Sequence, residues 1–360
     1  MKIVTVIGAR PQFIKAALLS NKLREKHLEI IIHTGQHYDK NISDVFFQEL
    51  EIPLPDYNLA IGSATHGKQT GKMLIKIEEK LMIERPDYVI VYGDTNSTLA
   101  AALAASKLNI SLIHIESGLR SFDKKMPEEK NRIITDHLSS ILFCPTQNAV
   151  KNLQNEGIKE GVYNVGDIMY DLFLKYKKVA LYKSKILEKL NLEKENYYLA
   201  TIHRAENTDN KNKLSIILKT LNILDKKVLF PAHPRTINKI KAYNLQINSY
   251  KNISFIESVG YLDMLKLLIN CQKVLTDSGG LQKEAYFASK PCITLRNSTE
   301  WLETLTDNWN ILVDINTESI LKAVKSQKTK LKKTNKKSFG NGDTFQRIIQ
   351  VINKLEKGKG

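Results

Sequence analysis

Short runs of β-branched and other apolar residues recur along the chain, separated by longer segments with apolar residues at helical spacing. Strands that alternate with helices in this way are typical of parallel sheets with helices on both faces. In the first half, the runs that predict strands are Ile3–Ile7, Glu29–Thr34, Tyr88–Tyr92, Ser111–Ile115, Ile141–Cys144 and Val162–Val165. In the second half they are Tyr197–Thr201, Lys227–Pro231, Ile253–Phe255, Lys273–Thr276 and Cys292–Leu295. The pattern predicts an α/β protein with two Rossmann-like, doubly wound parallel sheets. Because such sheets bind ligands beyond the carboxyl ends of their strands, we expect the two to face a central cleft.

The chain has 360 residues, which is long enough for two hydrophobic cores. The predicted boundary falls near Gly166–Asp167, after the last short strand of the first half. We therefore predict an N-terminal domain over residues 1–166 and a C-terminal domain over residues 167–340. A lysine-rich helical segment, Leu172–Lys194, leads into the second domain, and Thr344–Leu355 has the pattern of a final amphipathic helix.

No apolar run approaches the roughly 20 residues of a membrane span, and the first strand is too brief for a signal peptide. We therefore expect a cytoplasmic protein with no membrane partner. The three cysteines, Cys144, Cys271 and Cys292, are widely spaced and odd in number. This spacing argues against a disulfide framework and against a zinc site, so we expect buried thiols and no metal.

The formal net charge is +16, from 54 basic and 38 acidic residues. Part of the excess is local, because eight lysines and no acidic residue occur between Lys322 and Lys337. Such a run is typical of a solvated helix face or a linker, and it contains no aromatic residue that could stack on bases. We expect no nucleic-acid partner, since a small anionic substrate uses a basic cleft equally well.

Cations follow the first predicted strand in the segment GARPQFIK. Gly8 permits a tight turn, and Arg10 and Lys15 stand near a helix N-terminus, where the helix dipole also favours anions. This arrangement predicts a contact with a phosphate or diphosphate. A plain turn with surface cations is the alternative.

Carboxylates follow two later strands. Asp94 lies in VYGDTNSTLA, Glu116 lies in HIESGLR, and Glu128 follows after a basic loop. Carboxylates aimed at one cleft and flanked by arginines are what proton transfer beside an anionic leaving group needs. The alternatives are a helix-capping role for Asp94 and an ordinary ion-paired surface turn for the glutamates.

Basic residues follow strands of the second half as well. His203 and Arg204 lie in TIHRAEN, with Glu206 near enough to orient one of them, and His233 and Arg235 lie in HPRT. Both pairs can contact a diphosphate. A structural role for each histidine is the alternative.

The strongest anion-binding signal is the segment TDSGGLQKEA. Ser278, Gly279 and Gly280 lie between a strand and a helix, where backbone N–H groups form a nest for an anion. Glu284 lies about one helical turn further on, where its carboxylate can accept hydrogen bonds from ribose hydroxyls. A structural turn remains the alternative.

Taken together, the polar turns read GARPQFIK, GQHYD, VYGDTNSTLA, HIESGLR, MPEEKNR, TIHRAEN, HPRT and TDSGGLQKEA, in order over almost the whole chain. This set resembles the non-hydrolysing UDP-N-acetylglucosamine 2-epimerases. The resemblance implies a glycosyltransferase-B arrangement in which residues 341–360 cross back onto the first domain. It also implies interconversion of UDP-GlcNAc and UDP-ManNAc without metal or nicotinamide. We expect a homodimer with a UDP-sugar substrate and no cofactor.

The resemblance further implies a mechanism in which UDP is eliminated to leave a 2-acetamidoglucal and is then added back. Asp94, Glu116 and Glu128 match the acid/base positions of the family, and His203 matches its catalytic histidine. The residues that match its cationic turn and its UDP site are Arg10, Lys15, Ser278, Gly279, Gly280 and Glu284.

The chain departs from the common form GTRPEAIK of the first turn at Ala9, Gln12 and Phe13, and the loop RSFDKKMPEE is shorter than usual. These departures resemble the branch that epimerises UDP-2,3-diacetamido-2,3-dideoxyglucuronate. That sugar carries a C3 acetamido group and a C6 carboxylate, which an extra cation such as Arg296 or Lys124 would meet. The exact sugar stays open.

The GQH segment matches part of the family's regulatory second UDP-GlcNAc site. Gln36 and His37 are present, whereas the following Tyr38 and Asp39 leave activation by that site open.

Other activities remain open. A hydrolysing epimerase would release free ManNAc and UDP, and a glycosyltransferase of the same fold would pass the sugar to an acceptor. The density of carboxylates in the first half argues against a glycosyltransferase, and a pure binding module would not require Asp94, Glu116 and Glu128 together. We expect the epimerised sugar to supply a surface polysaccharide.

Overall fold

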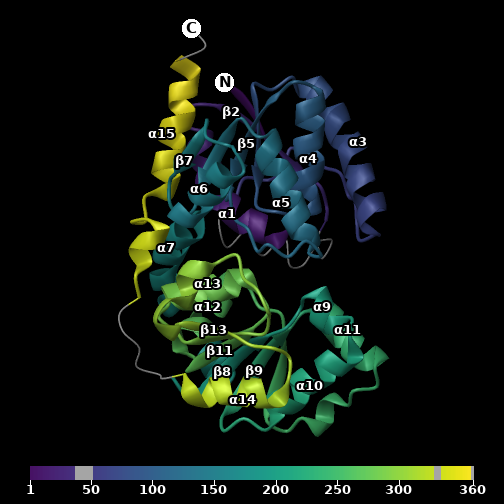
Figure 1. Ribbon diagram of the computed structural model, residues 1–360, viewed down its shortest axis with the longest axis vertical. Helices are drawn as coiled ribbons and strands as arrows, with labels where there is room; N and C mark the ends of the chain where they lie inside the picture. Colours follow the sequence, from purple (N-terminus) through teal and green to yellow (C-terminus); the bar gives the residue numbers. More distant parts are fainter. Residues whose placement is uncertain (37–51, 328–333, 358–360) are drawn as a thin grey trace. The chain divides into compact units, whose positions relative to one another are not determined.

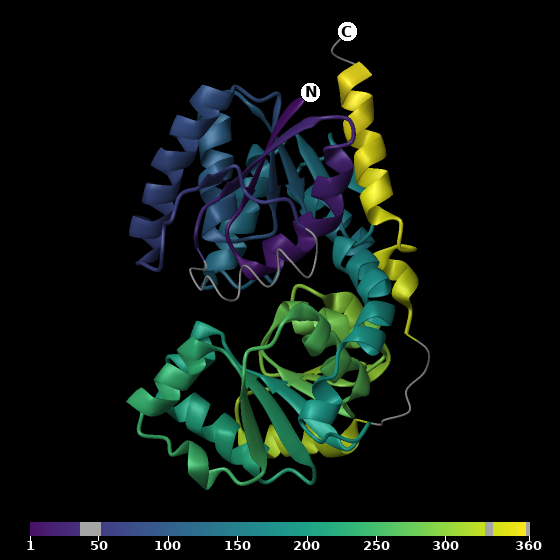
Figure 2. The same ribbon diagram turned by 180° about the vertical axis from the view of Figure 1, so that it is seen from behind.

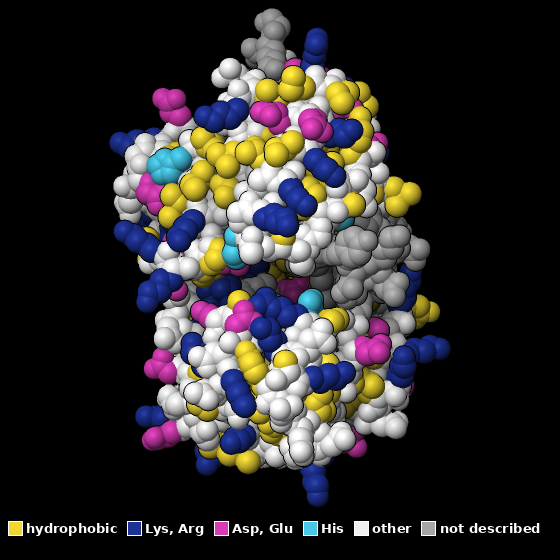
Figure 3. Space-filling view, turned by 90° about the vertical axis from the view of Figure 1, so that its right-hand side faces the viewer, with side chains coloured by type: hydrophobic (Ala, Val, Ile, Leu, Met, Phe, Trp, Pro, Cys, Tyr) yellow, Lys and Arg dark blue, Asp and Glu magenta, His cyan; other side chains and the backbone are white. Residues whose placement is uncertain are grey.

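The computed structural model describes residues 1–36, 52–327 and 334–357, which form two compact units. Unit 1 comprises Met1–Leu174 and Lys336–Gly360, and unit 2 comprises Lys175–Asn335 (Figure 1). Among the described residues, no helix combines the length and the apolar character needed to cross a membrane. On the face drawn in Figure 3, Lys and Arg side chains are dispersed among polar and apolar ones in each unit.

Unit 1 is built on a seven-stranded sheet of parallel neighbours in the order β3-β2-β1-β4-β5-β6-β7. Its strands are β1 (Lys2–Ile7), β2 (Leu28–His33), β3 (Tyr57–Asn58), β4 (Tyr88–Tyr92), β5 (Ser111–Ile115), β6 (Ile141–Cys144) and β7 (Val162–Asn164). Helices cover both faces of the central strands, which explains their continuous apolar runs. The edge strand β3 was not predicted, because two residues carry no recognisable pattern.

The helices with residues in unit 1 are α1 (Arg10–Leu23), α3 (His66–Glu84), α4 (Asn96–Lys107), α5 (Pro127–Leu138), α6 (Gln147–Asn155), α7 (Ile168–Lys183) and α15 (Thr344–Lys357). Figures 1 and 2 show α3, α4 and α5 together on one face of the sheet, and α1 with α15 on the other. Helix α4 buries a row of alanines against Met73, Ile77 and Leu81 of α3 and against the sheet. Small side chains let these layers approach closely, which fixes α4 and the turn that precedes it.

Unit 2 contains a six-stranded sheet of parallel neighbours in the order β10-β9-β8-β11-β12-β13. Its strands are β8 (Tyr197–Thr201), β9 (Lys227–Ala232), β10 (Ile253–Glu257), β11 (Lys273–Thr276), β12 (Cys292–Thr294) and β13 (Asn310–Leu312). Its other helices are α8 (Ile186–Lys189), α9 (Ala205–Thr208), α10 (Lys211–Asn222), α11 (Pro234–Ala242), α12 (Tyr261–Asn270), α13 (Gly279–Phe287) and α14 (Thr317–Ser326). Leucines of α10 and apolar residues of α14 pack against one face of the sheet. The edge strand β13 was not predicted.

The predicted fold class, α/β with two Rossmann-like parallel sheets, is confirmed. In a parallel sheet the carboxyl ends of all strands lie along one edge, where ligands bind. The turns after β1, β4 and β5 therefore share an edge in unit 1, and the turns after β8, β9 and β11 share an edge in unit 2.

The cysteine prediction is also confirmed. Cys144, Cys271 and Cys292 are free and buried. Burial raises the pKa of each thiol to about 12, so these side chains behave as small apolar groups at neutral pH.

Helix α15 packs against α1 and completes unit 1. Its Ile348 and Ile352 are fully buried. Nε2 of His27, which follows α1, lies 2.9 Å from Oδ1 of Asn353. The last helix is therefore an integral part of the first unit rather than an appendage.

Asp171 links α7 to the start of α15. Its carboxylate accepts a hydrogen bond of 3.0 Å from the backbone N–H of Phe345. Burial raises the pKa of Asp171 from 3.8 to about 6, and this N–H only partly opposes the shift. A carboxyl group with a raised folded-state pKa holds its proton more tightly in the folded state. Its ionisation therefore lowers stability as the pH rises from about 4 to about 6, by up to about 3 kcal/mol.

Asp171→Asn is expected to raise the free energy of unfolding of unit 1 near neutral pH, because the amide keeps an acceptor for Phe345 without a buried charge. Near pH 3 the same change should have little effect, since the aspartate is then mostly protonated in both states. Urea unfolding at the two pH values, followed by hydrogen exchange in α15, measures both quantities. The exposed Asp314→Asn serves as the control. A destabilised variant near neutral pH would contradict this account.

Candidate active site

The turn after β1 is held by the side-chain amide of Gln12. Its Oε1 accepts hydrogen bonds from the backbone N–H groups of Gly8 and Ala9 at 2.8 and 3.0 Å, and its Nε2 donates to the carbonyl of Tyr92 at 2.9 Å. Gly8 has no room for a side chain, because a Cβ there would lie 1.9 Å from Oγ1 of Thr34. A carboxylate at position 12 could not donate to Tyr92. Gln12 therefore ties the turn after β1 to the end of β4.

The structure pairs one of the cations predicted for this turn with a predicted carboxylate. Nζ of Lys15 lies 2.5 Å from Oε1 of Glu116, and the two side chains are only 8% and 10% exposed. Gly93 lies against this pair with φ of 62°, and a Cβ there would come within 3.2 Å of Nζ. Arg10 begins α1, but its side chain lies outside the described part of the structure.

Glu116 leaves β5 in an unusual backbone conformation. Its φ is 73°, in the left-handed region that non-glycine residues rarely adopt. The backbone N–H groups of Glu116 and Ser117 both donate to the carbonyl of Phe143 at 3.1 Å, which holds the turn in place. Such conformations persist where the surroundings enforce them, and they gather at functional sites.

Asp94 does not cap α4. The cap is Thr95, and Asp94 instead forms an ion pair with Nη2 of Arg132. Nη1 of Arg132 forms a second ion pair of 2.8 Å with Glu129, and both of these side chains are only 2% exposed. Asn131 donates to the backbone carbonyl of Asp94 at 2.9 Å. The inner face of α5 thus sets the position of Asp94.

The two glutamates of the MPEEKNR motif have different surroundings. Glu129 accepts hydrogen bonds of 2.8 to 3.1 Å from the backbone N–H groups of Ser121 and Phe122 and from the Ser121 hydroxyl. Glu128 is half-buried, and within residues 1–36, 52–327 and 334–357 it takes part in no ion pair. Glu129 therefore shapes the loop that follows Glu116, whereas Glu128 is not held by a described cation.

A buried polar network lies beside the Gly93 turn. Nδ1 of His114 lies 2.7 Å from Oδ1 of Asp136, and Nε2 lies 2.7 Å from the carbonyl oxygen of Gly93. Nη1 of Arg120 donates to Oδ2 of Asp136 at 2.6 Å, and Arg120 also pairs with both oxygens of Glu156 at 2.7 Å. Burial alone raises the pKa of Asp136, but His114 and Arg120 outweigh it and hold the pKa below its ordinary value.

In unit 2, Asp277 organises the turn after β8. Its carboxylate accepts hydrogen bonds from the backbone N–H groups of His203 and Arg204 and from the side chain of Asn207, at 3.0 to 3.2 Å. Nδ1 of His203 lies 3.5 Å from the same carboxylate, and the ring is about half exposed. The sequence predicted Glu206 as the carboxylate that orients His203 or Arg204. In the structure Asp277 makes these contacts, and Glu206 is exposed. The sequence signal that could have identified Asp277 is its position directly after strand β11.

The predicted anion nest starts α13. Ser278 is its N-cap and accepts a hydrogen bond from the third N–H of the helix at 3.3 Å. A Cβ on Gly279 would lie 2.4 Å from Oε1 of Glu300. Glu300 also lies 3.0 Å from Nη2 of Arg296 and 3.9 Å from Nη2 of Arg204. Glu300, which the sequence did not single out, therefore joins two predicted substrate-binding arginines.

Gly280 and Glu284 follow on α13. Gly280 is the less restricted glycine, since a Cβ there would meet only Oγ of Ser278 at 3.8 Å. Glu284 accepts a hydrogen bond of 2.9 Å from the hydroxyl of the buried Tyr261, which fixes its orientation.

His233 and Arg235 begin α11 at the turn after β9. His233 is the N-cap and accepts from the backbone N–H of Arg235 through Nδ1 at 3.2 Å. The guanidinium of Arg235 forms an exposed ion pair of 2.7 Å with Asp209, which also pairs with Lys239. Exposed pairs of this kind exchange partners at little cost, so Arg235 can turn to an anion.

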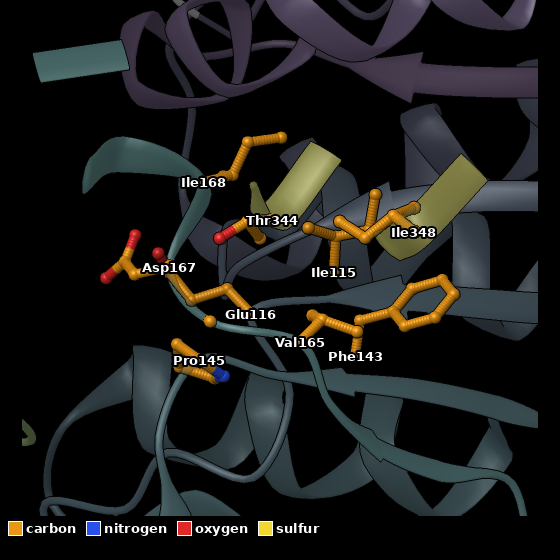
Figure 4. Close-up of a pocket in the computed structure, with 10 residues that line it drawn as sticks. Ile115, Glu116, Phe143, Pro145, Val165, Asp167, Ile168, Thr344 and Ile348 are labelled. Carbon is orange, nitrogen blue, oxygen red and sulfur yellow. The ribbon is translucent and has the colours of Figure 1, made fainter. Parts of the chain in front are cut away.

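Unit 1 has a pocket at the carboxyl ends of β5, β6 and β7, where Glu116 forms part of the wall (Figure 4). Asp167 lies at one end of the view and Phe143 at the other. The lining residues are Ile115, Glu116, Phe143, Pro145, Val165, Gly166, Asp167, Ile168, Thr344 and Ile348. Glu116 thus forms an ion pair with Lys15 and also borders a mainly apolar pocket. Among the described residues, no group of His, Cys, Asp and Glu side chains is arranged to hold a metal ion.

Comparison with known proteins identifies the family. A family model described as UDP-N-acetylglucosamine 2-epimerase matches residues 21–353. A UDP-N-acetylglucosamine 2-epimerase homolog of Methanococcus maripaludis is 55% identical over 358 residues, covering 99% of this chain and 100% of the relative. The UDP-2,3-diacetamido-2,3-dideoxy-D-glucuronate 2-epimerase of Pseudomonas aeruginosa is 46% identical over 364 residues, with coverage of 99% and 100%.

A solved structure supports the same family. The crystal structure of Methanocaldococcus jannaschii UDP-GlcNAc 2-epimerase in complex with UDP-GlcNAc and UDP matches with a TM-score of 0.92 at 46% identity, covering 98% of this chain and 99% of that one. The resemblance predicted from the ordered turns is confirmed: the chain belongs to the UDP-N-acetylglucosamine 2-epimerase family of isomerases.

Proposed function

We propose that this chain interconverts a UDP-2-acetamido sugar and its C2 epimer by eliminating UDP and adding it back. The observation that carries the proposal is the buried Lys15–Glu116 ion pair beside the Gly93–Asp94 turn. It places a fixed carboxylate and a cation together at the edge of the sheet where ligands bind. The Methanocaldococcus jannaschii structure, which holds UDP-GlcNAc and UDP, supports the substrate class.

The reaction couples proton removal to loss of a good leaving group. The hydrogen on C2 of the sugar is only weakly acidic, so a carboxylate must take the proton as the C1–O bond to UDP breaks. The C2–H electron pair becomes the C1–C2 double bond of a 2-acetamidoglucal, and the C1–O pair leaves on UDP. Return of a proton to the opposite face of C2, with attack of the UDP oxygen on C1, gives the epimer.

We assign the acid/base work to Asp94, Glu116 and Glu128. Arg132 and Lys15 hold the first two at defined positions, which lowers the entropic cost of aligning them with the sugar. Glu128 has no described ion pair and can turn towards the substrate. Lys15, and Arg10 at the start of the same helix, are the cations that we assign to the departing diphosphate.

We propose that unit 2 holds the nucleotide through the turns after its strands β8, β9 and β11. Asp277 presents the half-exposed His203, which we assign a catalytic role, and the start of α13 offers backbone N–H groups to a phosphate. Glu284, oriented by Tyr261, is suited to accept from ribose hydroxyls. The further residues assigned to substrate binding are Arg204, His233, Arg235, Ser278, Gly279, Gly280 and Arg296.

Two sugars fit this chemistry. The Pseudomonas aeruginosa relative favours UDP-2,3-diacetamido-2,3-dideoxyglucuronate as the second candidate beside UDP-GlcNAc. Of the two cations considered for its C6 carboxylate, Arg296 is buried against Glu300, whereas Lys124 is exposed on the loop between Glu116 and α5. Lys124 is therefore the cation that can adapt to the charge on that sugar.

We further propose that the protein is a cytoplasmic homodimer. We also propose that the product of its reaction supplies a surface polysaccharide. UDP-linked sugars are activated donors for glycan synthesis, which suits that use. Ile75, Met82 and Ile83 are exposed along α3, and such apolar side chains suit a contact with a second copy of the chain.

NMR of both UDP sugars, each incubated with the enzyme in deuterated water, tests the function. Epimer should form from at least one sugar, with deuterium at C2 of substrate and product, and a chelator should not stop the reaction. The Asp94→Asn variant is the matched control that should show little exchange. Release of free sugar and UDP would instead indicate the hydrolysing enzyme, and an epimer without deuterium at C2 would exclude the elimination route.

A further inference from the structure

His114 is completely buried between two oxygen atoms on opposite sides of its ring. Nδ1 lies 2.7 Å from the carboxylate of Asp136, and Nε2 lies 2.7 Å from the backbone carbonyl of Gly93. A neutral imidazole has one N–H donor and one nitrogen acceptor. A backbone carbonyl has no hydrogen to give, so Nε2 must be the donor on that side. The state of the ring then depends on which atom supplies the hydrogen on the Asp136 side.

Asp136 is a poor source of that hydrogen. Its Oδ2 already accepts from Nη1 of Arg120 at 2.6 Å and from the backbone N–H of Gly118 at 3.1 Å. Burial raises the pKa of Asp136, but the contact with the Arg120 guanidinium opposes burial and favours the ionised carboxylate whatever the state of His114. Nδ1 must therefore donate as well. We infer that His114 is a doubly protonated imidazolium in the folded protein at neutral pH, and that it is a positioning residue for the Gly93–Asp94 turn.

The charges around His114 agree with this state. Arg120 is the cation that contacts Asp136, and it also pairs with both oxygens of Glu156. Glu156 also lies 3.3 Å from Nε2 of the half-exposed His137. Among Arg120, Asp136 and Glu156 there are one cation and two carboxylates, and an imidazolium at His114 balances these three charges. Uncompensated charge is costly in a protein interior, so the balanced cluster is the more stable one. The nearby thiol of Cys144 adds no charge, because burial raises its pKa to about 12.

The imidazolium fixes a peptide group that touches the proposed catalytic residues. The carbonyl of Gly93 is held by His114, and its N–H donates to the carbonyl of Ile115 at 2.9 Å. Gly93 packs against the Lys15–Glu116 pair, and the next residue along the chain is Asp94. His114 thus acts through the backbone, without touching substrate. Its effect on turnover rests on the proposed function, but its protonation state does not.

NMR of the wild-type enzyme tests the protonation state directly. The protein is labelled with ¹⁵N in histidine and ¹³C in glycine carbonyls, and one imidazole nitrogen should couple through its hydrogen bond to a glycine carbonyl. Of the eight histidines, the one with this coupling should carry N–H at both ring nitrogens near pH 7.5. His33 is the internal contrast, because burial lowers its pKa and a single N–H is expected there. A single N–H on the coupled ring would overturn the inference.

Two variants test the positioning role. Gln at position 114 keeps an N–H near the place of Nε2 and can still donate to Gly93, whereas Asn keeps one near the place of Nδ1 and reaches only Asp136. His114→Gln is therefore expected to retain a kcat at least about tenfold above that of His114→Asn, with similar affinity for UDP, since small displacements of catalytic groups are costly. Equal kcat values would overturn the positioning role. If neither variant folds, the wild-type spectrum decides the protonation state. If the wild type epimerises neither sugar, the proposed function fails and the spectrum still stands.

Discussion

Replacing Glu116 with glutamine, or Asp94 with asparagine, is expected to lower kcat for epimerisation by about a hundredfold or more, because proton transfer typically contributes about 10²–10⁴ to a rate. Each amide keeps the shape of the side chain but cannot accept or return the C2 proton. The affinity for UDP should change little, since we place the nucleotide on unit 2. Steady-state kinetics, with calorimetric titration of UDP, separate the two quantities.

The control for Glu116→Gln is Glu25→Gln, just beyond the end of α1, the helix that carries Lys15. Lys22 and Glu25 form an ion pair of 2.7 Å, but both side chains are about half exposed, and the pair lies away from the strand-end turns. This control should retain wild-type kcat. Thermal unfolding of every variant is followed as well, because Glu116→Gln leaves the buried Lys15 without its carboxylate. Near-normal kcat in both site variants would remove Glu116 and Asp94 from acid/base catalysis.

Replacing Arg132 with methionine is expected to lower the free energy of unfolding of unit 1 by about 3–5 kcal/mol, the usual result of removing one partner from a buried ion pair. Methionine fills much of the space of the arginine stem but leaves Glu129 as a buried charge with no cation beside it. Asp94 loses its partner as well, so kcat should fall with stability. Hydrogen exchange in β4 and β5 under increasing urea reports the stability of this unit.

The matched control is Arg347→Met. Arg347 pairs with Asp343 at 3.0 Å, but both side chains are about 40% exposed, so the change should cost less than about 1 kcal/mol. In the double variant Arg132→Met with Glu129→Gln, part of the stability should return, because the buried carboxylate is then neutral. A stability loss for Arg132→Met no larger than that of Arg347→Met would show that the pair contributes little.

Much of the fold could be predicted because buried parallel strands are continuous apolar runs. Nine of the eleven runs correspond to strands whose two faces are both covered, or nearly so, and the other two correspond to the more exposed β7 and β10. The strands β3 and β13, which have two and three residues at the sheet edges, were missed, whereas the equally short edge strand β7 was predicted from the run Val162–Val165. Edge strands of that length owe much of their conformation to the neighbouring strand.

The sequence predicted which residues belong to the candidate site, but it did not predict which of them form ion pairs with one another. Lys15 and Glu116 are 101 residues apart, and Asp94 and Arg132 are 38 apart, so no local spacing indicates either pair. The buried polar side of helix α5 was more difficult to predict from the sequence. Its many polar residues resemble a solvated surface helix, yet the side that carries Glu129, Arg132 and Asp136 is buried against the strand-end turns. Buried polar networks lack the apolar periodicity on which sequence interpretation depends.

The position of α15 has a consequence for synthesis of the protein on the ribosome. The partners that this helix covers on α1 are translated first, but Ile348 and Ile352 follow only after the whole of Lys175–Asn335. At about 5–20 residues per second, those roughly 160 residues take on the order of 10–30 s to translate. During that interval α15 cannot cover its apolar contact surface on α1, so we expect this surface to be accessible to a ribosome-associated chaperone until the last helix emerges.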